Sequence, residues 1–242
     1  MSGHSHFRTI QHKKELEDQK RGKVFSKLSK MIAFAAKEGA DPDKNSKLKQ
    51  VIEEAKRFNL PKENIQRAIK RGANANNKDS LERVVYEALG PEGSAFVIEG
   101  ITDNKNRMLS EIKQVLQKYN LKLAGEGSVL WLFEEKGIIR LKKTCESSEE
   151  KEKAELTAIE CGAEDLCWDK NNSLCIYTKP FEIEKVKKAL IDKGLEILSS
   201  ILGWKAKQKI SLNEKEGEKC RLFLSELSKN EDVQNIYDNL KN

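Results

Sequence analysis

The spacing of the apolar residues changes near residue 80, and this change constrains the fold more than any other feature of the sequence. Before it, apolar residues recur at helical intervals in three stripes, which are Val24, Leu28, Met31, Ile32 and Ala35, then Leu48, Val51, Ile52, Ala55 and Phe58, and finally Ile65, Ala68 and Ile69. Gly39 is predicted to end the first helix, Pro61 to open the third at its first position, and Gly72 to end the third. Three amphipathic helices joined by short links can share one small core.

Beyond the segment 73–80, which shows no periodicity, strand-like runs alternate with helical ones. The expected strands are 82–89, 94–101, 128–133, 137–141, 164–168, 173–178, 196–201, 205–212 and 232–237. The expected helices are 104–119, 148–161, 181–193 and 217–228. The order βαββαβ between residues 137 and 201 is that of a ferredoxin-like unit.

This order predicts an α+β fold with three domains, a helical N-terminal domain and two ferredoxin-like α/β domains, the last inserted into the second. Neither 81–133 nor 205–238 closes a sheet well alone, so we expect them to share one. The predicted domains are a basic helical domain at 1–78, a discontinuous α/β domain at 79–134 and 205–242, and an inserted ferredoxin-like domain at 135–204. The alternative is two consecutive domains with the C-terminal segment packed elsewhere.

Positive charge is concentrated in the first third of the chain. Residues 1–80 hold 19 Lys and Arg against 10 Asp and Glu, a net charge of +9, whereas residues 81–242 hold 26 against 29, a net charge of −3. A fold does not require this asymmetry, and a polyanionic partner explains it. Solubility alone is the alternative.

The basic residues of this third are therefore the first candidate binding site. Lys and Arg neutralise phosphates and release counterions when they bind nucleic acid, and Lys20, Lys23 and Lys27 are spaced to share one helix face. The predicted nucleic-acid-binding residues are Lys13, Lys14, Lys20, Arg21, Lys23, Lys27, Lys62, Lys70 and Arg71. The alternative is a set of solvated side chains that cover a small domain.

A second candidate site lies where a predicted strand leads into a helix. Thr102 or Asp103 can cap this helix, and free backbone amides there, together with Lys105 and Arg107, could hold a phosphate. The candidate residues for this phosphate or partner contact are Asp103, Asn104, Lys105 and Arg107. Helix capping alone is the alternative.

Aromatic residues are sparse in the basic third. Phe25, Phe34 and Phe58 lie on or near the apolar stripes, so we expect them in the core rather than on a stacking surface. No helix-turn-helix spacing is evident. This pattern weakens the case for a sequence-specific reader of DNA, and it is neutral for RNA, where shape and backbone dominate recognition.

Several classes of site are not indicated. The five cysteines, at 145, 161, 167, 175 and 220, form no CxxC pair, so we expect buried thiols in a reducing compartment and no zinc site. His4 could bind Cu(II) adventitiously if Met1 is removed, and no functional metal and no cofactor are expected. No catalytic motif occurs, so no enzyme activity is predicted. No apolar run of membrane-spanning length occurs, and we expect a cytoplasmic protein.

Short motifs along the whole chain resemble those of the YebC/PmpR family. They are MSGHS at 1–5, QHKK at 11–14, KRGKVF at 20–25, NLPKENI at 59–65, RAIKRG at 67–72, TDNKNR at 102–107, GEGSV at 125–129 and DVQNIYDN at 232–239. They follow the order and spacing of the family. Three departures are His6-Phe7, where Lys-Trp is usual, Leu60, where Met is usual, and Ala40, where a second glycine is usual.

The resemblance implies a helical domain followed by two α/β domains, and a non-enzymatic regulator of gene expression. Many members of the family are named DNA-binding transcriptional regulators. Others, including a mitochondrial translational activator of cytochrome c oxidase, act at the ribosome, so a ribosome- or RNA-associated translation factor is the alternative. A scaffold that binds partners through sheet edges is a third interpretation, and an unrecognised hydrolase a fourth. The expected partner is DNA or ribosomal RNA.

Overall fold

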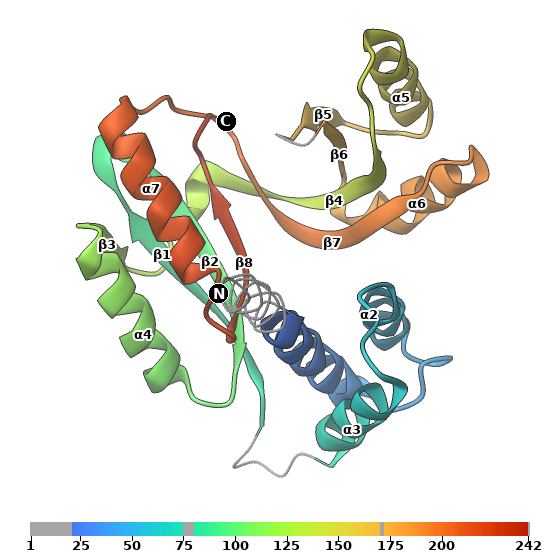
Figure 1. Cartoon of the computed structure of the whole chain (residues 1–242), viewed down its shortest axis with the longest axis horizontal. Coiled ribbons are helices and arrows are strands. Elements are labelled where there is room, and N and C mark those ends of the chain that lie inside the picture. Colours follow the sequence, from blue (N-terminus) through green and yellow to red (C-terminus); the bar gives the residue numbers. More distant parts are fainter. Residues whose placement is uncertain (1–20, 75–79, 170–171, 242) are drawn as a thin grey trace, which may run out of the picture. The chain divides into compact units, whose positions relative to one another are not determined.

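The computed structural model of this chain describes residues 21–74, 80–169 and 172–241. The fold is mixed α+β, with two four-stranded antiparallel sheets and helices packed on them (Figure 1). The described residues divide into two compact units. The first comprises the residues up to Ala88 together with Ile98–Leu123 and Glu214–Ile236, and the second comprises the remaining described residues.

The N-terminal helices of the first unit share one hydrophobic core. The described part of the first helix covers residues 21–35 and continues into a 3-10 helix at Ala36–Glu38; α2 (Ser46–Arg57) and α3 (Lys62–Ala73) follow. Their apolar faces form one buried cluster, as the helical spacing predicts, which includes Leu28, Ile32, Leu48, Ile52, Ile65, Ala68 and, from later segments, Leu81 and Ile101.

Asn45 joins the end of the first helix to the start of α2. Its side-chain oxygen accepts a hydrogen bond from the backbone nitrogen of Leu48 at 3.0 Å and so caps α2. Its side-chain nitrogen donates to the carbonyl oxygens of Ala35 and Gly39, both at 2.8 Å. Gly39 has a φ of 147° and ends the helical path, as predicted.

Gly72 has a role that differs from the predicted one. It does not end α3, which continues to Ala73 with Asn74 as its C-cap. A Cβ atom at position 72 would lie 2.0 Å from the carbonyl oxygen of Ala33 and 2.9 Å from the Cβ atom of Ala36. Glycine is required because α3 meets the backbone of the first helix there, and helix periodicity does not reveal such a contact.

The first sheet has the strand order β3-β1-β2-β8. In chain order its elements are β1 (Glu82–Leu89), a 3-10 helix (Pro91–Gly93), β2 (Ala95–Thr102), α4 (Lys105–Lys118), β3 (Lys122–Ala124), α7 (Glu214–Leu227) and β8 (Val233–Asp238). All eight residues of β2 are buried, because strands flank it on both sides and α4 and α7 cover one face of the sheet (Figure 1).

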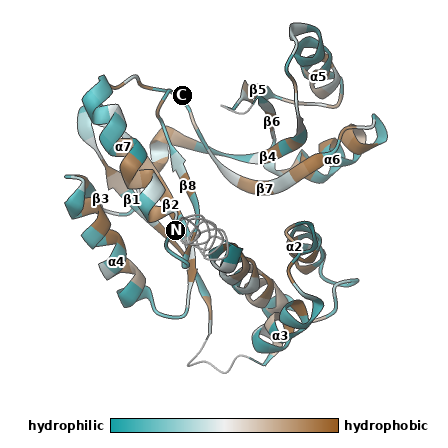
Figure 2. Cartoon of the chain, in the orientation of Figure 1, coloured by the Kyte–Doolittle hydropathy of each residue, from teal (hydrophilic) through white to brown (hydrophobic). Residues whose placement is uncertain are grey.

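The second sheet has the order β5-β6-β4-β7, and all its neighbouring strands are antiparallel. Its elements are a 3-10 helix (Leu130–Leu132), β4 (Phe133–Thr144), α5 (Ser148–Glu160), β5 (Asp165–Trp168), β6 (Ser173–Thr178), a 3-10 helix (Pro180–Glu182), α6 (Ile183–Asp192) and β7 (Ile197–Ala206). The predicted βαββαβ order is therefore present. Ile139 and Ile176 of the central strands pack with Ala158 of α5 and Leu190 of α6, so both helices cover one face. Figure 2 shows α6 in alternating hydrophilic and hydrophobic colours, which is typical of a helix with one buried side.

The strand predictions around this sheet are wrong in two places. Segments 128–133 and 137–141 are not two strands, because a 3-10 helix leads into the single long strand β4. Segment 205–212 is not a separate strand, because β7 continues to Ala206 and only Ile210 forms an isolated bridge beyond it. Both strands are longer than predicted because β4 and β7 pair with each other, and this pairing supplies backbone hydrogen bonds beyond the predicted strand ends. The three-residue strand β3 has no counterpart in the prediction, since it is too short to show alternation.

The prediction of uniformly buried cysteines is also only partly right. Cys145, Cys175 and Cys220 are buried, whereas Cys161 and Cys167 are partly exposed. Cys161 follows the last turn of α5, and Cys167 lies on the edge strand β5, so neither position is fully covered by neighbouring elements.

Candidate nucleic-acid interface

Three of the predicted nucleic-acid-binding residues, Lys13, Lys14 and Lys20, lie outside the described residues. Arg21 opens the described part of the first helix and is exposed. Its guanidinium carbon lies over the ring of Phe25, 5.3 Å from the centroid. This stacking holds the charge near the helix surface and leaves the donors of the guanidinium available to a phosphate.

Lys27 points toward the end of α7. Its ammonium nitrogen donates to the carbonyl oxygen of Ser228 at 2.8 Å. Burial lowers the pKa of the Lys27 ammonium, and the positive charges of Lys23 and Lys30 lower it further. Lys27 therefore contributes to the packing of the first helix inside its unit, and Lys23 is half-buried as well.

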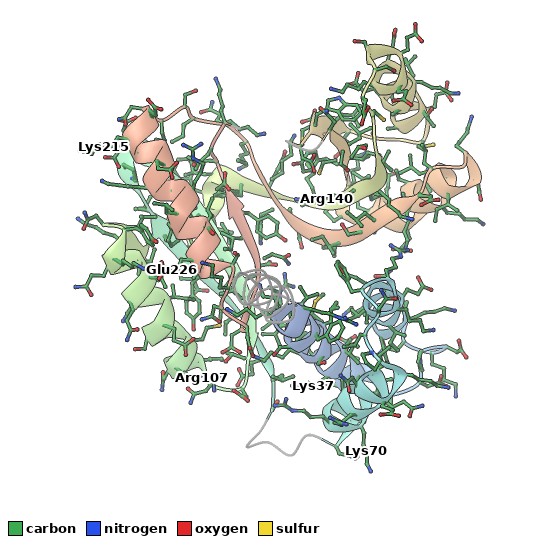
Figure 3. All side chains as sticks on the ribbon, viewed as in Figure 1. Lys37, Lys70, Arg107, Arg140, Lys215 and Glu226 are labelled. Atoms are coloured by element: carbon green, nitrogen blue, oxygen red, sulfur yellow. The ribbon has the colours of Figure 1, made fainter. Side chains whose placement is uncertain are left out.

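Four exposed positive charges without an internal ion pair among the described residues lie on α2 and α3. Lys62 and Lys70 are exposed and lie eight residues apart, so they occupy one side of α3 (Figure 3 shows Lys70). Lys56 at the end of α2 and Arg67 in α3 are exposed as well. Within the described ranges, none of these four side chains forms an ion pair. We call Lys56, Lys62, Arg67 and Lys70 the exposed cation group.

The sequence pattern did not single out Lys56 and Arg67. Lys56 follows the buried Ala55, and Arg67 precedes the buried Ala68. The apolar spacing alone therefore does not say whether these two side chains face the solvent. Both nonetheless lie on the polar side of an amphipathic helix. That position is the signal that could have identified them.

Other exposed lysines of the helical segment already have carboxylate partners. These pairs are Lys44 with Asp41 at 3.5 Å, Lys47 with Glu38 at 2.8 Å and Lys49 with Asp43 at 3.8 Å. A phosphate would have to compete with these carboxylates, whereas it meets no such competition at the exposed cation group. The helical segment therefore contains two sets of exposed cations, one paired with carboxylates and one without carboxylate partners among the described residues.

The second candidate site surrounds the first turn of α4. The side-chain oxygen of Asn104 accepts from the backbone nitrogen of Arg107 at 3.0 Å, and the hydroxyl oxygen of Thr102 accepts from the backbone nitrogen of Asn104 at 3.0 Å. These bonds occupy amides that a phosphate at this helix terminus would use. Lys105 forms an ion pair with Glu82 at 2.5 Å. Capping, the alternative interpretation of this segment, is thus present, but the N-cap is Asn104 and not the predicted Thr102 or Asp103.

Asp103 brings together one residue from each predicted set. Its carboxylate lies 2.9 Å from Arg107 of α4 and 3.4 Å from Arg71 of α3. Arg71 is consequently neutralised by a neighbour, unlike the exposed cation group. This carboxylate links the last turn of α3 to the first turn of α4.

Asp232, immediately before β8, is the centre of a larger polar network that the residue pattern does not single out. Its buried carboxylate accepts from Arg107 at 2.8 Å and from the Thr102 hydroxyl at 3.0 Å, and it forms a direct ion pair with Lys30 of the first helix. Burial disfavours the charged carboxylate, but the hydrogen bonds from Lys30 and Arg107 outweigh it and lower the pKa of Asp232 below its ordinary value. The hydrogen bond to Asp232 in turn raises the pKa of Arg107.

Phe58 does not lie in the core, contrary to the expectation from its stripe. Its side chain is 45% exposed, whereas Leu60, two residues later, is only 4% exposed. Asn59 between them has a φ of 58°, so the chain turns sharply after α2 and places Leu60 in the core instead. Phe25 and Phe34 are partly buried against the helical core, as expected.

No cluster of three or more His, Cys, Asp or Glu residues suited to a metal ion occurs within residues 21–74, 80–169 and 172–241. No helix in those same ranges has the length and hydrophobicity needed to cross a membrane.

Comparisons with known proteins match almost the whole chain. Residues 5–75 match the family model described as the TACO1/YebC protein N-terminal domain, and residues 81–240 match the one described as the TACO1/YebC second and third domain. These two matches cover both the exposed cation group and the Asp232 network.

Individual relatives agree with these matches. Proteins named "probable transcriptional regulatory protein" are 43% identical in Caldanaerobacter subterraneus and 41% identical in Thermoanaerobacter pseudethanolicus, each over the full length of this chain and 98% and 97% of the relative. The crystal structure of a conserved hypothetical protein from Aquifex aeolicus is 37% identical, with a TM-score of 0.84 over 91% of this chain and 90% of that one.

Proposed function

This chain belongs to the TACO1/YebC family, and from this premise we propose that it is a cytoplasmic DNA-binding regulator of transcription that catalyses no reaction. The names of the relatives as probable transcriptional regulatory proteins support regulation as the function. We propose that the helical domain at 1–78 binds the phosphate backbone. In this proposal the helical domain is followed by a discontinuous α/β domain at 79–134 and 205–242, and the domain at 135–204 is inserted into that α/β domain.

The observation that carries this proposal is the exposed cation group. Its four positive charges have no carboxylate partner among the described residues, although nearby lysines of the same segment do. Unpaired exposed cations are the groups that gain most from phosphate contact, because binding releases counterions without breaking an internal ion pair. Arg21 and Lys23 would extend this contact at its margins, with Lys13, Lys14 and Lys20 on the segment before the first described helix. Arg71 would join the contact only by giving up its ion pair with Asp103.

Base recognition would be weak in this arrangement. A lysine contacting phosphate fixes position and contributes no sequence information. The binding free energy would therefore depend strongly on salt concentration and weakly on DNA sequence. Additional selectivity would have to come from DNA shape or from another protein bound nearby.

The proposal can be tested by comparing two charge-matched triple variants of the full chain. In the first, Lys62, Arg67 and Lys70 are each replaced by Gln; in the second, the internally paired Lys44, Lys47 and Lys49 are each replaced by Gln. Both remove three positive charges from exposed positions of the same segment. Binding to a fluorescent DNA duplex is measured by anisotropy at several salt concentrations.

We expect the first variant to bind more weakly and to reduce the slope of log K against log salt by up to about 0.9 per lost phosphate contact. The second variant should retain most of the affinity and slope. Equal losses in both variants would show that only net charge matters and would contradict the assigned surface.

The nucleic acid itself is identified by two parallel measurements. A footprint of the chain on promoter DNA supports transcription control. Cosedimentation with ribosomes that resists high salt, with no footprint on DNA, would overturn the DNA assignment in favour of translation. The same triple variants identify whether the exposed cation group is used in either case.

A further inference from the structure

Two cysteines lie directly opposite each other in the second sheet. In the antiparallel register of β5 and β6, Cys167 pairs with Cys175. Directly opposed residues on antiparallel strands have Cα atoms about 4.5 to 5.5 Å apart, a separation that a disulfide bond can span. The register therefore places the two residues next to each other on neighbouring strands.

Both side chains lie on the sheet face that α5 and α6 leave uncovered. The flanking residues Leu166, Leu174 and Ile176 pack into the core beneath the helices, and side chains alternate between faces along a strand. Cys167 and Cys175 consequently share the opposite face. Cys167 is partly exposed at the edge strand, while Cys175 is 6% exposed beside it.

The surroundings of Cys167 favour its thiolate. A hydrogen bond from the Cys175 thiol contributes most, the Tyr177 hydroxyl lies 3.5 Å from the Cys167 sulfur, and the positive charges of Lys209 and Arg140 add to the effect. Although burial opposes ionisation, together these groups lower the pKa of Cys167 to about 6. Figure 3 shows Arg140 on β4, the strand that neighbours β6.

The described chain offers no comparable environment at the other cysteines. Cys145 and Cys220 are buried. Cys161 is partly exposed, but burial raises the pKa of its thiol and so disfavours the reactive form. Among the five cysteines, only the pair on β5 and β6 places a partly exposed thiol with a lowered pKa directly opposite a second thiol.

We propose that Cys167 and Cys175 are a redox-modification site, at which hydroperoxides convert the two thiols into an intramolecular disulfide. The Cys167 thiolate attacks one peroxide oxygen, the O–O bond breaks, and the leaving oxygen takes up a proton as water or an alcohol. The Cys175 sulfur then attacks the resulting sulfenic acid and expels hydroxide, which leaves as water with the Cys175 proton. The two thiols lose two electrons and the peroxide gains them.

This site is independent of the proposed DNA contact. The disulfide would tie the edge strand β5 covalently to β6 on the face of the second sheet opposite α5 and α6. A dithiol reductant would reverse the reaction through thiol–disulfide exchange. The chain would then exist in two covalent states set by the balance of oxidant and reductant.

The test uses the reduced full-length protein and hydrogen peroxide as the oxidant. After exposure and removal of peroxide, thiols are counted under denaturing conditions and the bridged peptides are identified by mass spectrometry. We expect the count to fall from five to three, the mass to fall by two hydrogens, and the bridge to link Cys167 with Cys175. The oxidation rate should rise as the pH increases through about 6 and then level off.

Three variants complete the test. Cys175→Ser should accumulate a sulfenic acid on Cys167 that a dimedone probe traps, and Cys167→Ser should lose the reaction. Cys161→Ser, the matched control at the other partly exposed cysteine, should oxidise as the unmodified protein does. The proposal would be overturned if the thiol count stays at five, if the bridge links other cysteines, or if the probe labels Cys161 in place of Cys167. Circular dichroism establishes that each variant is folded.

Discussion

The buried carboxylate of Asp232 and the guanidinium of Arg107 lie 2.8 Å apart, which ties the entrance of β8 to the first turn of α4. The same carboxylate pairs with Lys30 of the first helix. One acidic side chain therefore connects the N-terminal helices to the α/β part of the first unit. The free energy of this contact depends on complete pairing, because a buried charge that loses its partners is strongly unfavourable.

Replacing Asp232 by Asn should destabilise the protein by about 1 to 3 kcal/mol, since Lys30 and Arg107 would lose their shared acceptor. The neighbouring Glu231→Gln is the control, because Glu231 accepts a hydrogen bond from Ser26 in an exposed position. Urea unfolding at neutral pH measures both changes. Equal effects of the two substitutions would contradict the central role of Asp232.

Acid should weaken this contact in a defined direction. The pKa of Asp232 is lower in the folded protein than in the unfolded chain, where it is about 3.9. Its contribution to the free energy of unfolding is therefore fully present above pH 4 to 5 and is lost as the pH falls through the folded-state pKa. The stability difference between the unmodified protein and Asp232→Asn should be constant from pH 7 to 5 and should shrink in stronger acid. A difference that grows on acidification would refute this linkage.

Gly72→Ala should destabilise the helical segment, because the new methyl group would meet the carbonyl oxygen of Ala33 at 2.0 Å. Overpacking of this kind costs about 1 to 3 kcal/mol. Gly217→Ala is the matched control in another helix, where a Cβ atom meets nothing within 4 Å. The control should be neutral or stabilising by up to about 1 kcal/mol, as alanine favours helix over glycine. Thermal unfolding followed by circular dichroism measures the stability of both variants. An unchanged stability of Gly72→Ala would argue against close contact between α3 and the first helix.

Asn45→Ala should cost more stability than Asn104→Ala, although each residue caps a helix. Loss of a capping side chain typically costs about 1 kcal/mol. Asn45 additionally satisfies the carbonyl oxygens of Ala35 and Gly39, so its removal should approach about 2 kcal/mol or exceed it. Chemical denaturation of both variants provides the comparison, and similar losses would show that the two added hydrogen bonds contribute little.

Periodicity alone predicted the elements whose apolar residues repeat over several turns or strand positions. The three N-terminal helices and the βαββαβ order of the second sheet are visible in this way, because burial of one face imposes a regular spacing on the sequence. The excess of positive charge in the first third of the chain could also be read from the sequence, because it depends on composition alone. Motif resemblance identified the family, which the comparisons confirm.

Contacts between segments distant in sequence were decided by tertiary structure. Gly72 is required by the backbone of Ala33, and Asp232 is charged and buried because Lys30 and Arg107 reach it from other elements. Phe58 is exposed because the turn at Asn59 places Leu60 in the core. Sequence spacing reports which face of an element is apolar, whereas pairing, neutralisation and close approach depend on which other element meets that face; only the folded chain specifies that partner.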